Sequence, residues 1–89
     1  MISDSNFKSL KNILLKNFTD TTLMIILNGT IQTKMLITNS KITICKNKII
    51  ISNEEKDFTI DFIVMKKIIL DNEYRVKIIF EDFEIILEI

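Results

Sequence analysis

The chain is 89 residues long, which is enough for one domain with a single modest core. It contains no His or Pro and only one Gly and one Cys, so a glycine-rich phosphate loop, a proline-rich recognition segment and an internal disulfide are excluded. Its 12 basic and 12 acidic residues cancel, but residues 1–53 hold seven lysines against two aspartates and residues 54–89 hold ten carboxylates against five basic residues. This asymmetry predicts a dipolar surface that selects an oppositely charged partner, or another copy of the chain.

Nothing in the sequence has the pattern of a targeting or membrane segment. The first residues lack the basic and apolar regions of a signal peptide. No apolar run approaches the roughly 18 residues of a membrane span, and the lone Cys45 suits a reducing compartment. We therefore expect a single cytoplasmic domain over residues 1–89, with no membrane partner.

One helix is predicted, over about residues 5–18. Phe7, Leu10, Leu14 and Phe18 recur at steps of three and four, which places them on one apolar stripe. Elsewhere the composition favours strands, because the chain has twenty Ile and no Ala.

The strands after the helix are expected to form hairpins. Asn28-Gly29 is a preferred type I′ turn dipeptide and predicts a hairpin between Leu23–Leu27 and Thr30–Ile37. A second hairpin around Lys46-Asn47 would place Ile44 opposite Ile49.

The second half of the chain continues this pattern. Asn53–Asp57 reads as a charged loop, and the following residues alternate with a period of two. Val64–Leu70 is expected to be a strand closed by Asp71-Asn72. In the last hairpin a turn at Glu81-Asp82 puts the apolar side chains of both strands on the same face. It pairs Phe80 with Phe83, Ile78 with Ile85, Val76 with Leu87 and Arg75 with Glu88.

The predicted fold class is therefore α+β. It consists of the N-terminal helix and an antiparallel β-meander of six to eight short strands over about residues 22–89, forming a curled sheet or a small barrel. Several predicted strands are apolar on both faces: Met24–Leu27, Ile49–Ile51, Ile68–Leu70 and Ile85–Leu87. One helix is too short to cover the second face of the whole sheet. We therefore expect barrel closure or self-association, for example a dimer through the sheet.

Candidates for catalysis are few. Without His, the usual general base and the commonest metal ligand are absent. Cys45 lies beside two lysines but has no activating base, and Asp57 and Asp61 are typical of a solvated strand face. We therefore predict that the protein is not an enzyme and uses no cofactor or metal.

Acidic side chains are the preferred candidates for a binding surface. Five of them fall at the turns of the last hairpins and would gather near the hairpin ends: Asp71, Glu73, Glu81, Asp82 and Glu84. A patch of this kind steers a basic partner. The sequence thus favours an interaction module, meaning an inhibitor, adaptor or assembly subunit, with a basic or nucleic-acid-binding protein as its partner.

An alternative function rests on the lysines. Lys8, Lys11 and Lys16 of the helix could neutralise phosphates of a nucleic acid. The helix followed by residues 23–29, LMIILNG, is similar to the opening of Sm-like proteins, the bacterial Hfq type included, and residues 64–68, VMKKI, resemble their second motif. The resemblance implies a ring of small barrels that binds single-stranded RNA.

Overall fold

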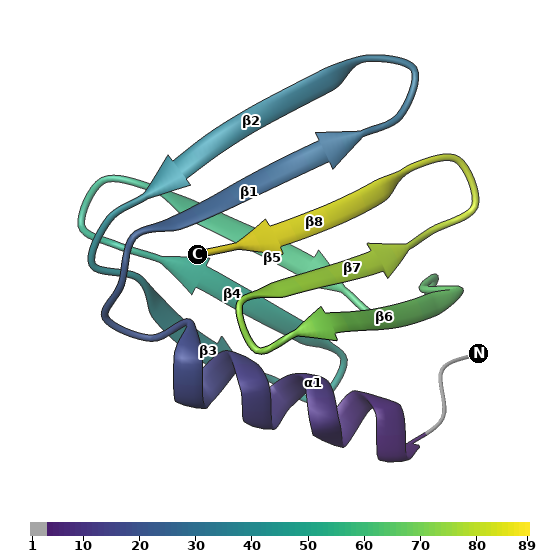
Figure 1. The fold of residues 1–89 in the computed structure, drawn as a ribbon, viewed down its shortest axis with the longest axis horizontal. Coiled ribbons are helices and arrows are strands. Elements are labelled where there is room, and N and C mark those ends of the chain that lie inside the picture. Colours follow the sequence, from purple (N-terminus) through teal and green to yellow (C-terminus); the bar gives the residue numbers. More distant parts are fainter. Residues whose placement is uncertain (1–3) are drawn as a thin grey trace.

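The computed structural model describes residues 4–89, with side chains from Asn6 onward. Within this range the chain forms one helix followed by eight antiparallel strands (Figure 1), which confirms the predicted α+β class. The elements are α1 Asp4–Asn17, β1 Leu23–Asn28, β2 Gln32–Ile37, β3 Lys41–Ile44, β4 Lys48–Ser52, β5 Asp57–Asp61, β6 Lys67–Asn72, β7 Arg75–Ile79 and β8 Glu84–Glu88.

The strands are divided between two sheets. A five-stranded sheet has the order β2-β1-β8-β7-β6, and a three-stranded sheet has the order β3-β4-β5. The chain changes sheet between β2 and β3 and again between β5 and β6. The described strands curl only moderately and do not close into a barrel. Neighbouring strands follow chain order as in a meander, except for β1 and β8, which join the two ends of the chain.

The core lies between the facing sides of the two sheets. Alternate residues of each strand point inward, so Ile25 of β1, Ile49 of β4 and Ile78 of β7 are all buried. The helix closes one side of this sandwich, where it contacts β3 and β6, the edge strands on that side (Figure 1). Its stripe residues Leu10 and Leu14 are fully buried in the same core.

Two of the predicted hairpins have the expected register. In the β3–β4 hairpin Ile44 pairs with Ile49, and the Cys45 N–H donates to the Lys48 carbonyl at 2.8 Å across the turn. In the β7–β8 hairpin every predicted pair is present: Val76 with Leu87, Ile78 with Ile85, Arg75 with Glu88, and the Phe80 N–H donating to the Phe83 carbonyl at 2.9 Å. Side-chain alternation was sufficient to set both registers.

The β1–β2 turn was predicted in the right place but with the wrong type. Asn28 pairs with Gln32, so three residues connect the strands, and Gly29 does not have a positive φ. A Cβ atom built on Gly29 would lie 3.1 Å from Phe83 Cβ. The small size of the glycine therefore suits the tight space beside the β7–β8 turn, and a left-handed backbone is not what selects it.

The prediction for β6 was also shifted. The strand begins at Lys67 and not at Val64, because residues 62–66 form the connection between the sheets. Asp71-Asn72 belongs to the strand, and the turn follows it. Asn72 Oδ1 accepts a hydrogen bond from the Tyr74 N–H at 2.7 Å, which fixes the turn two residues later than expected.

A buried serine joins the two loops beside the end of the helix. Ser40, which is 0% exposed, donates from Oγ to the Phe18 carbonyl at 2.6 Å and accepts from the Thr21 N–H at 3.3 Å. Its backbone adds two bonds, one from the Asp20 N–H to the Ser40 carbonyl at 2.7 Å and one from its own N–H to the Thr21 carbonyl at 3.0 Å. The crossover from β2 to β3 is thereby fixed to the α1–β1 loop.

Replacing this hydroxyl should destabilise the fold measurably. Ser40→Ala leaves the buried Phe18 carbonyl without its donor, so we expect the free energy of unfolding to fall by about 1–3 kcal/mol in urea titrations. Ser9→Ala, on the exposed face of α1, is the matched control and should change it by less than about 0.5 kcal/mol. Equal stabilities of the two variants would contradict the role given to Ser40.

Candidate interaction surfaces

The five acidic residues singled out in the sequence lie at two ends of the larger sheet. Glu81 and Asp82 form the β7–β8 turn, and Glu84 begins β8 beside it. Asp71 and Glu73 lie at the β6–β7 turn, at the other end of β7. The fold thus brings three of them together and separates the other two. We call Glu81, Asp82 and Glu84 the acidic turn.

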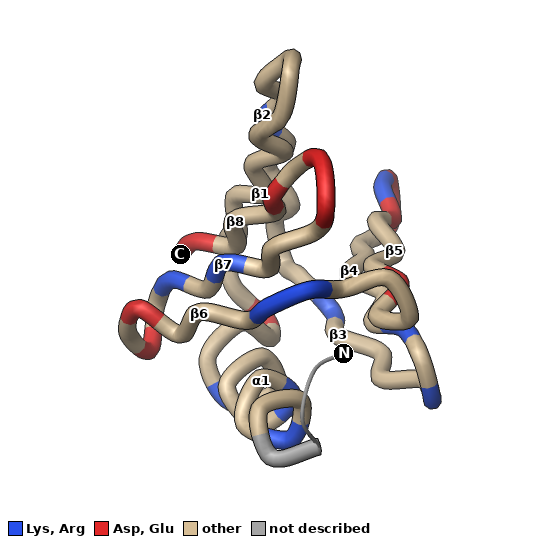
Figure 2. Tube along the Cα trace, turned by 90° about the vertical axis from the view of Figure 1, so that its right-hand side faces the viewer, with Lys and Arg blue, Asp and Glu red and all other residues tan. Residues whose placement is uncertain are grey.

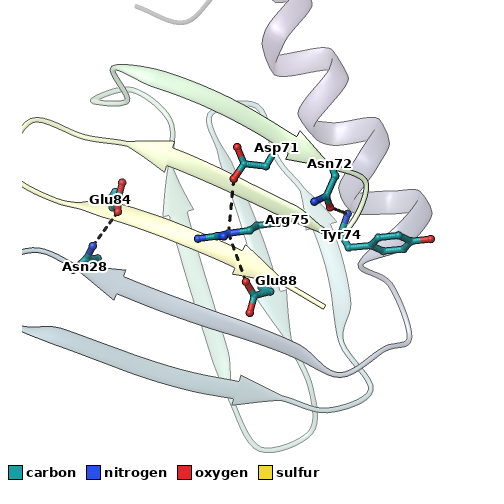
Figure 3. A network of polar contacts seen from close by, with 7 residues as sticks. All are labelled: Asn28, Asp71, Asn72, Tyr74, Arg75, Glu84 and Glu88. Atoms are coloured by element: carbon teal, nitrogen blue, oxygen red, sulfur yellow. Dashed lines mark hydrogen bonds and ion pairs between the residues drawn. The ribbon is translucent and has the colours of Figure 1, made fainter.

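The acidic turn is supported by neighbouring side chains. Asn28 Nδ2 donates to Glu84 Oε1 at 2.9 Å, which ties β8 to β1 (Figure 3). Phe80 and Phe83 stack at the base of the turn, with ring centroids 4.6 Å apart and planes 8° apart. Glu81 and Asp82 themselves are exposed. The carboxylates are therefore held on a rigid aromatic base while remaining available to a partner.

Beside the acidic turn an apolar cleft opens between the two sheets. It has a volume of about 350 Å³, and most of its lining is aliphatic or aromatic: Leu27, Phe58, Thr59, Ile60, Asp61, Val64, Phe80, Phe83 and Ile85. These residues come from β1 and β8 of one sheet, from β5 of the other, and from the β5–β6 and β7–β8 connections. The helix closes the sandwich at β3 and β6, so the cleft marks a side of the core that the helix leaves open.

Large apolar side chains are exposed around the cleft mouth. Phe83 is 41% exposed and Val64 is 64% exposed, and both line the cleft. Ile63, the neighbour of Val64 in the same loop, is 70% exposed. Asp61 also lines the cleft, and its Oδ1 accepts a hydrogen bond from the Ile63 N–H at 3.0 Å. Clustered apolar exposure of this kind with carboxylates beside it is typical of a protein-binding surface.

Of the other two acidic residues, Asp71 takes part in a cluster of charged side chains at the opposite end of the sheet. Arg75 Nε lies 3.8 Å from Asp71 Oδ2 and 3.5 Å from Glu88 Oε2 (Figure 3). Both distances are too long for hydrogen bonds, and Arg75 Nε is buried without a hydrogen-bond partner among the described residues. Glu73 contributes its backbone carbonyl, which accepts from Asn17 Nδ2 at 3.0 Å.

The lysines proposed for nucleic acid lie on α1. Lys8 and Lys16 are exposed, whereas Lys11 is half-buried with its Nζ 4.5 Å from the centroid of the Phe7 ring. Phe7 in turn contacts the ring of Phe62 at 4.7 Å, and Phe18 is fully buried. The aromatic side chains of this segment are thus used in packing, and they are not available to stack on bases.

Charges of opposite sign are only partly separated in space. The helix lysines lie at the base of the molecule, away from the acidic turn (Figure 2). The basic start of β6, however, lies beside that turn, because Ile79 pairs with Lys67 on one side and with Glu84 on the other. The surface is therefore less dipolar than the division of charge along the sequence suggests.

The candidate catalytic residues do not come together in the described chain. Cys45 is half-buried at the β3–β4 turn, and Asp57 and Asp61 lie at opposite ends of β5. No group of three or more His, Cys, Asp or Glu residues in the described part is arranged to hold a metal ion. In the same part, the helix is too short to cross a membrane.

No family model, no curated protein and no solved structure matches the chain. The similarity to Sm-like proteins therefore rests on the two short segments alone. Of the second, Val64, Met65 and Lys66 lie in the connection before β6 and not in a strand. The closed barrel that the resemblance implies is not formed by the described strands.

The sequence missed the apolar part of the candidate surface. The sequence pattern places Val64 in a strand, where an apolar side chain usually points toward the core. The usable signal was Phe62-Ile63-Val64, where three successive apolar residues end the strict alternation of Phe58 and Ile60. A break in period two indicates that the strand has ended, so some of these side chains must face solvent.

The fit between Gly29 and the aromatic base of the acidic turn can be tested by coupling. Gly29→Ala alone should lower the free energy of unfolding by about 0.5–1 kcal/mol, because the new methyl group meets Phe83 Cβ at 3.1 Å. In a Phe83→Gly background that contact is absent, and Gly29→Ala should instead stabilise by about 0.4–1 kcal/mol through the unfolded state. Denaturant titration of all four proteins measures both values, and additive effects would contradict this packing.

Proposed function

We propose that the protein is a non-enzymatic interaction module that binds a partner protein through the apolar cleft and the acidic turn. The observation that carries this proposal is the exposure of Phe83 and Val64 at the mouth of a cleft flanked by carboxylates. An inhibitor, an adaptor or an assembly subunit would each act in this way, by surface contact alone.

The cleft supplies the apolar centre of such an interface. Transfer of apolar surface from water contributes about 25 cal/mol per Å², and interface hot spots are large side chains that enter pockets. The volume of about 350 Å³ can accept one or two aliphatic or aromatic side chains. Phe80 and Phe83 are already stacked, so they would lose little side-chain freedom on binding.

The carboxylates supply the rim and define the partner chemistry. Glu81 and Asp82 are exposed beside the mouth, and Asp61 lies within the lining. Fixed negative charges around an apolar centre favour a segment whose apolar residue is flanked by Lys or Arg, and they repel one flanked by Asp or Glu. The partner is therefore expected to be a basic protein, which includes nucleic-acid-binding proteins.

Binding to short immobilised peptides tests this specificity. One set has a central Leu or Phe flanked by Lys or Arg, and the matched set has the same centre flanked by Asp or Glu. We expect the basic set to bind, and Glu81→Lys combined with Asp82→Lys to weaken binding by about tenfold or more. Glu54→Lys combined with Glu55→Lys, in the exposed β4–β5 loop, makes the same change in net charge and should leave binding unaltered.

The apolar contribution needs a variant of its own. Val64→Ser changes a side chain that is 64% exposed, so the fold should survive while peptide binding weakens. Leu15→Ser, at a position 49% exposed on α1, is the control. Equal binding of both peptide sets, or a Val64→Ser variant as active as the control, would contradict the proposal.

A further inference from the structure

The outer face of the five-stranded sheet carries a second set of apolar side chains. Six of them point away from the core: Met24, Ile26, Leu36, Ile69, Ile79 and Ile86. None belongs to the buried core cluster or to the partly buried side chains that pack against it. In Figure 1 this sheet lies in front of the smaller one, and no element formed by residues 4–89 covers its front face.

The registers define how these side chains are arranged. Across the middle of the face, Lys34, Ile26, Ile86, Lys77 and Ile69 lie in one row from β2 to β6. Ile86 at the centre is only 6% exposed, so its neighbours already pack around it. The middle row of the face therefore combines three isoleucines with two lysines, and its central isoleucine is already packed within one copy.

The charges that β7 and β8 present on this face are sorted by strand, whereas β6 carries both Lys67 and Asp71. Strand β7 presents Arg75 and Lys77, and the adjacent strand β8 presents Glu84 and Glu88, with Arg75 directly opposite Glu88 in the register. A row of positive charge thus runs beside a row of negative charge (Figure 3 shows Arg75, Glu84 and Glu88 on this face). A two-fold axis parallel to the strands and between β7 and β8 would place β7 of one copy over β8 of the other.

We infer that two copies of the chain dimerise face to face through this surface. In that arrangement Arg75 of each copy faces Glu88 of the other, and Lys77 lies within reach of the other copy's Glu84. By the same symmetry Ile26 faces Ile69, so apolar side chains meet on both sides of the charged centre. The same symmetry sets Ile86 of one copy against the aliphatic stem of Lys77 of the other, and Ile79 against Glu84, so the self-complementarity that an isologous interface needs comes from the Arg75–Glu88 and Ile26–Ile69 contacts. Aligned packing of two sheets about 10 Å apart is the geometry that this requires.

The size of the face sets the expected strength of the dimer. Five strands about 4.8 Å apart, each five or six residues long at about 3.4 Å per residue, give a face of roughly 24 by 17 Å. A two-fold axis between β7 and β8 leaves β2 outside the overlap, so the contact covers roughly 330 Å² per copy in projection, which is below the range of stable specific interfaces and typical of a weak, transient one. The dimer should therefore dissociate on dilution, and the cleft, Glu81 and Asp82 remain free for the partner proposed above, while Glu84 faces the second copy.

Sedimentation equilibrium over a range of concentrations is the first test. The wild-type chain should show a concentration-dependent dimer, and Ile26→Glu should raise its dissociation constant by about tenfold or more, because a carboxylate would enter the apolar part of the interface. Leu15→Glu introduces the same charge at an exposed position of α1 and should have no effect. Circular dichroism melts of each variant establish that the fold is retained.

Charge reversal provides the stricter test, because it predicts a rescue. In Arg75→Glu, residues 75 and 88 are both carboxylates, and in Glu88→Arg both are guanidinium groups. Like charges would then face each other between the two copies, so neither variant should dimerise with itself. An equimolar mixture should form a heterodimer, with a dissociation constant within about threefold of the wild-type value. A wild-type chain that stays monomeric at all concentrations, or a mixture that fails to associate, would overturn the inference. So would a dimer that survives Ile26→Glu but is lost in Val64→Ser, since the second copy would then occupy the cleft.

Discussion

The architecture depends on the packing of two isoleucine-rich sheet faces against each other, with only one helix available to seal them. A helix of 14 residues is about 21 Å long. The whole of α1 lies along the side of the sandwich formed by β3 and β6. Because Leu10, Leu14 and Phe18 are fully buried there, the helix cannot also cover another side. The open cleft and the uncovered outer face both result from the position of this one helix.

The local sequence pattern was sufficient to predict most of the helix and strands. It was not sufficient to predict which distant strands pair. The β7–β8 hairpin was predicted pair by pair because apolar alternation and the Arg75–Glu88 charge pair agree on one register. The pairing of Met24 with Glu88 joins segments far apart in sequence, and no local pattern encodes it. The division into two sheets depends on breaks at Thr38-Asn39 and at Phe62-Ile63, where polar and apolar residues respectively interrupt a strand without a Pro or Gly to mark it.

Of the candidate site, only the carboxylates could be predicted from the sequence, and the apolar side chains of the cleft could not. Carboxylates such as Glu81 and Asp82 are expected at a turn from composition alone, because turns are solvated. Whether Phe83 and Val64 are buried depends on how the sheets meet, which the sequence does not display. The same limit explains why Asp71 was grouped with Glu81: both were expected at turns, but Asp71 lies near the end of β6, and the direction of β7 places the two residues at opposite ends of the sheet.

The two proposed surfaces combine in a useful way. The cleft lies between the sheets, and the outer face lies on the far side of the larger sheet, so a dimer presents two clefts at once. A partner with two basic segments would then bind with an effective concentration set by the spacing of the clefts, and weak contacts at each cleft would suffice.

The central position of β8 bears on how the chain acquires its structure during synthesis. Strand β8 lies between β1 and β7, so the larger sheet has no continuous ladder until residues 84–88 have left the ribosome. Before that moment the β1–β2 hairpin can pack only on the smaller sheet and the helix, and no ladder joins it to β7 and β6, a state that is open to wrong pairing. Completion of the larger sheet is therefore a late event that joins distant segments, the kind of contact that slows folding.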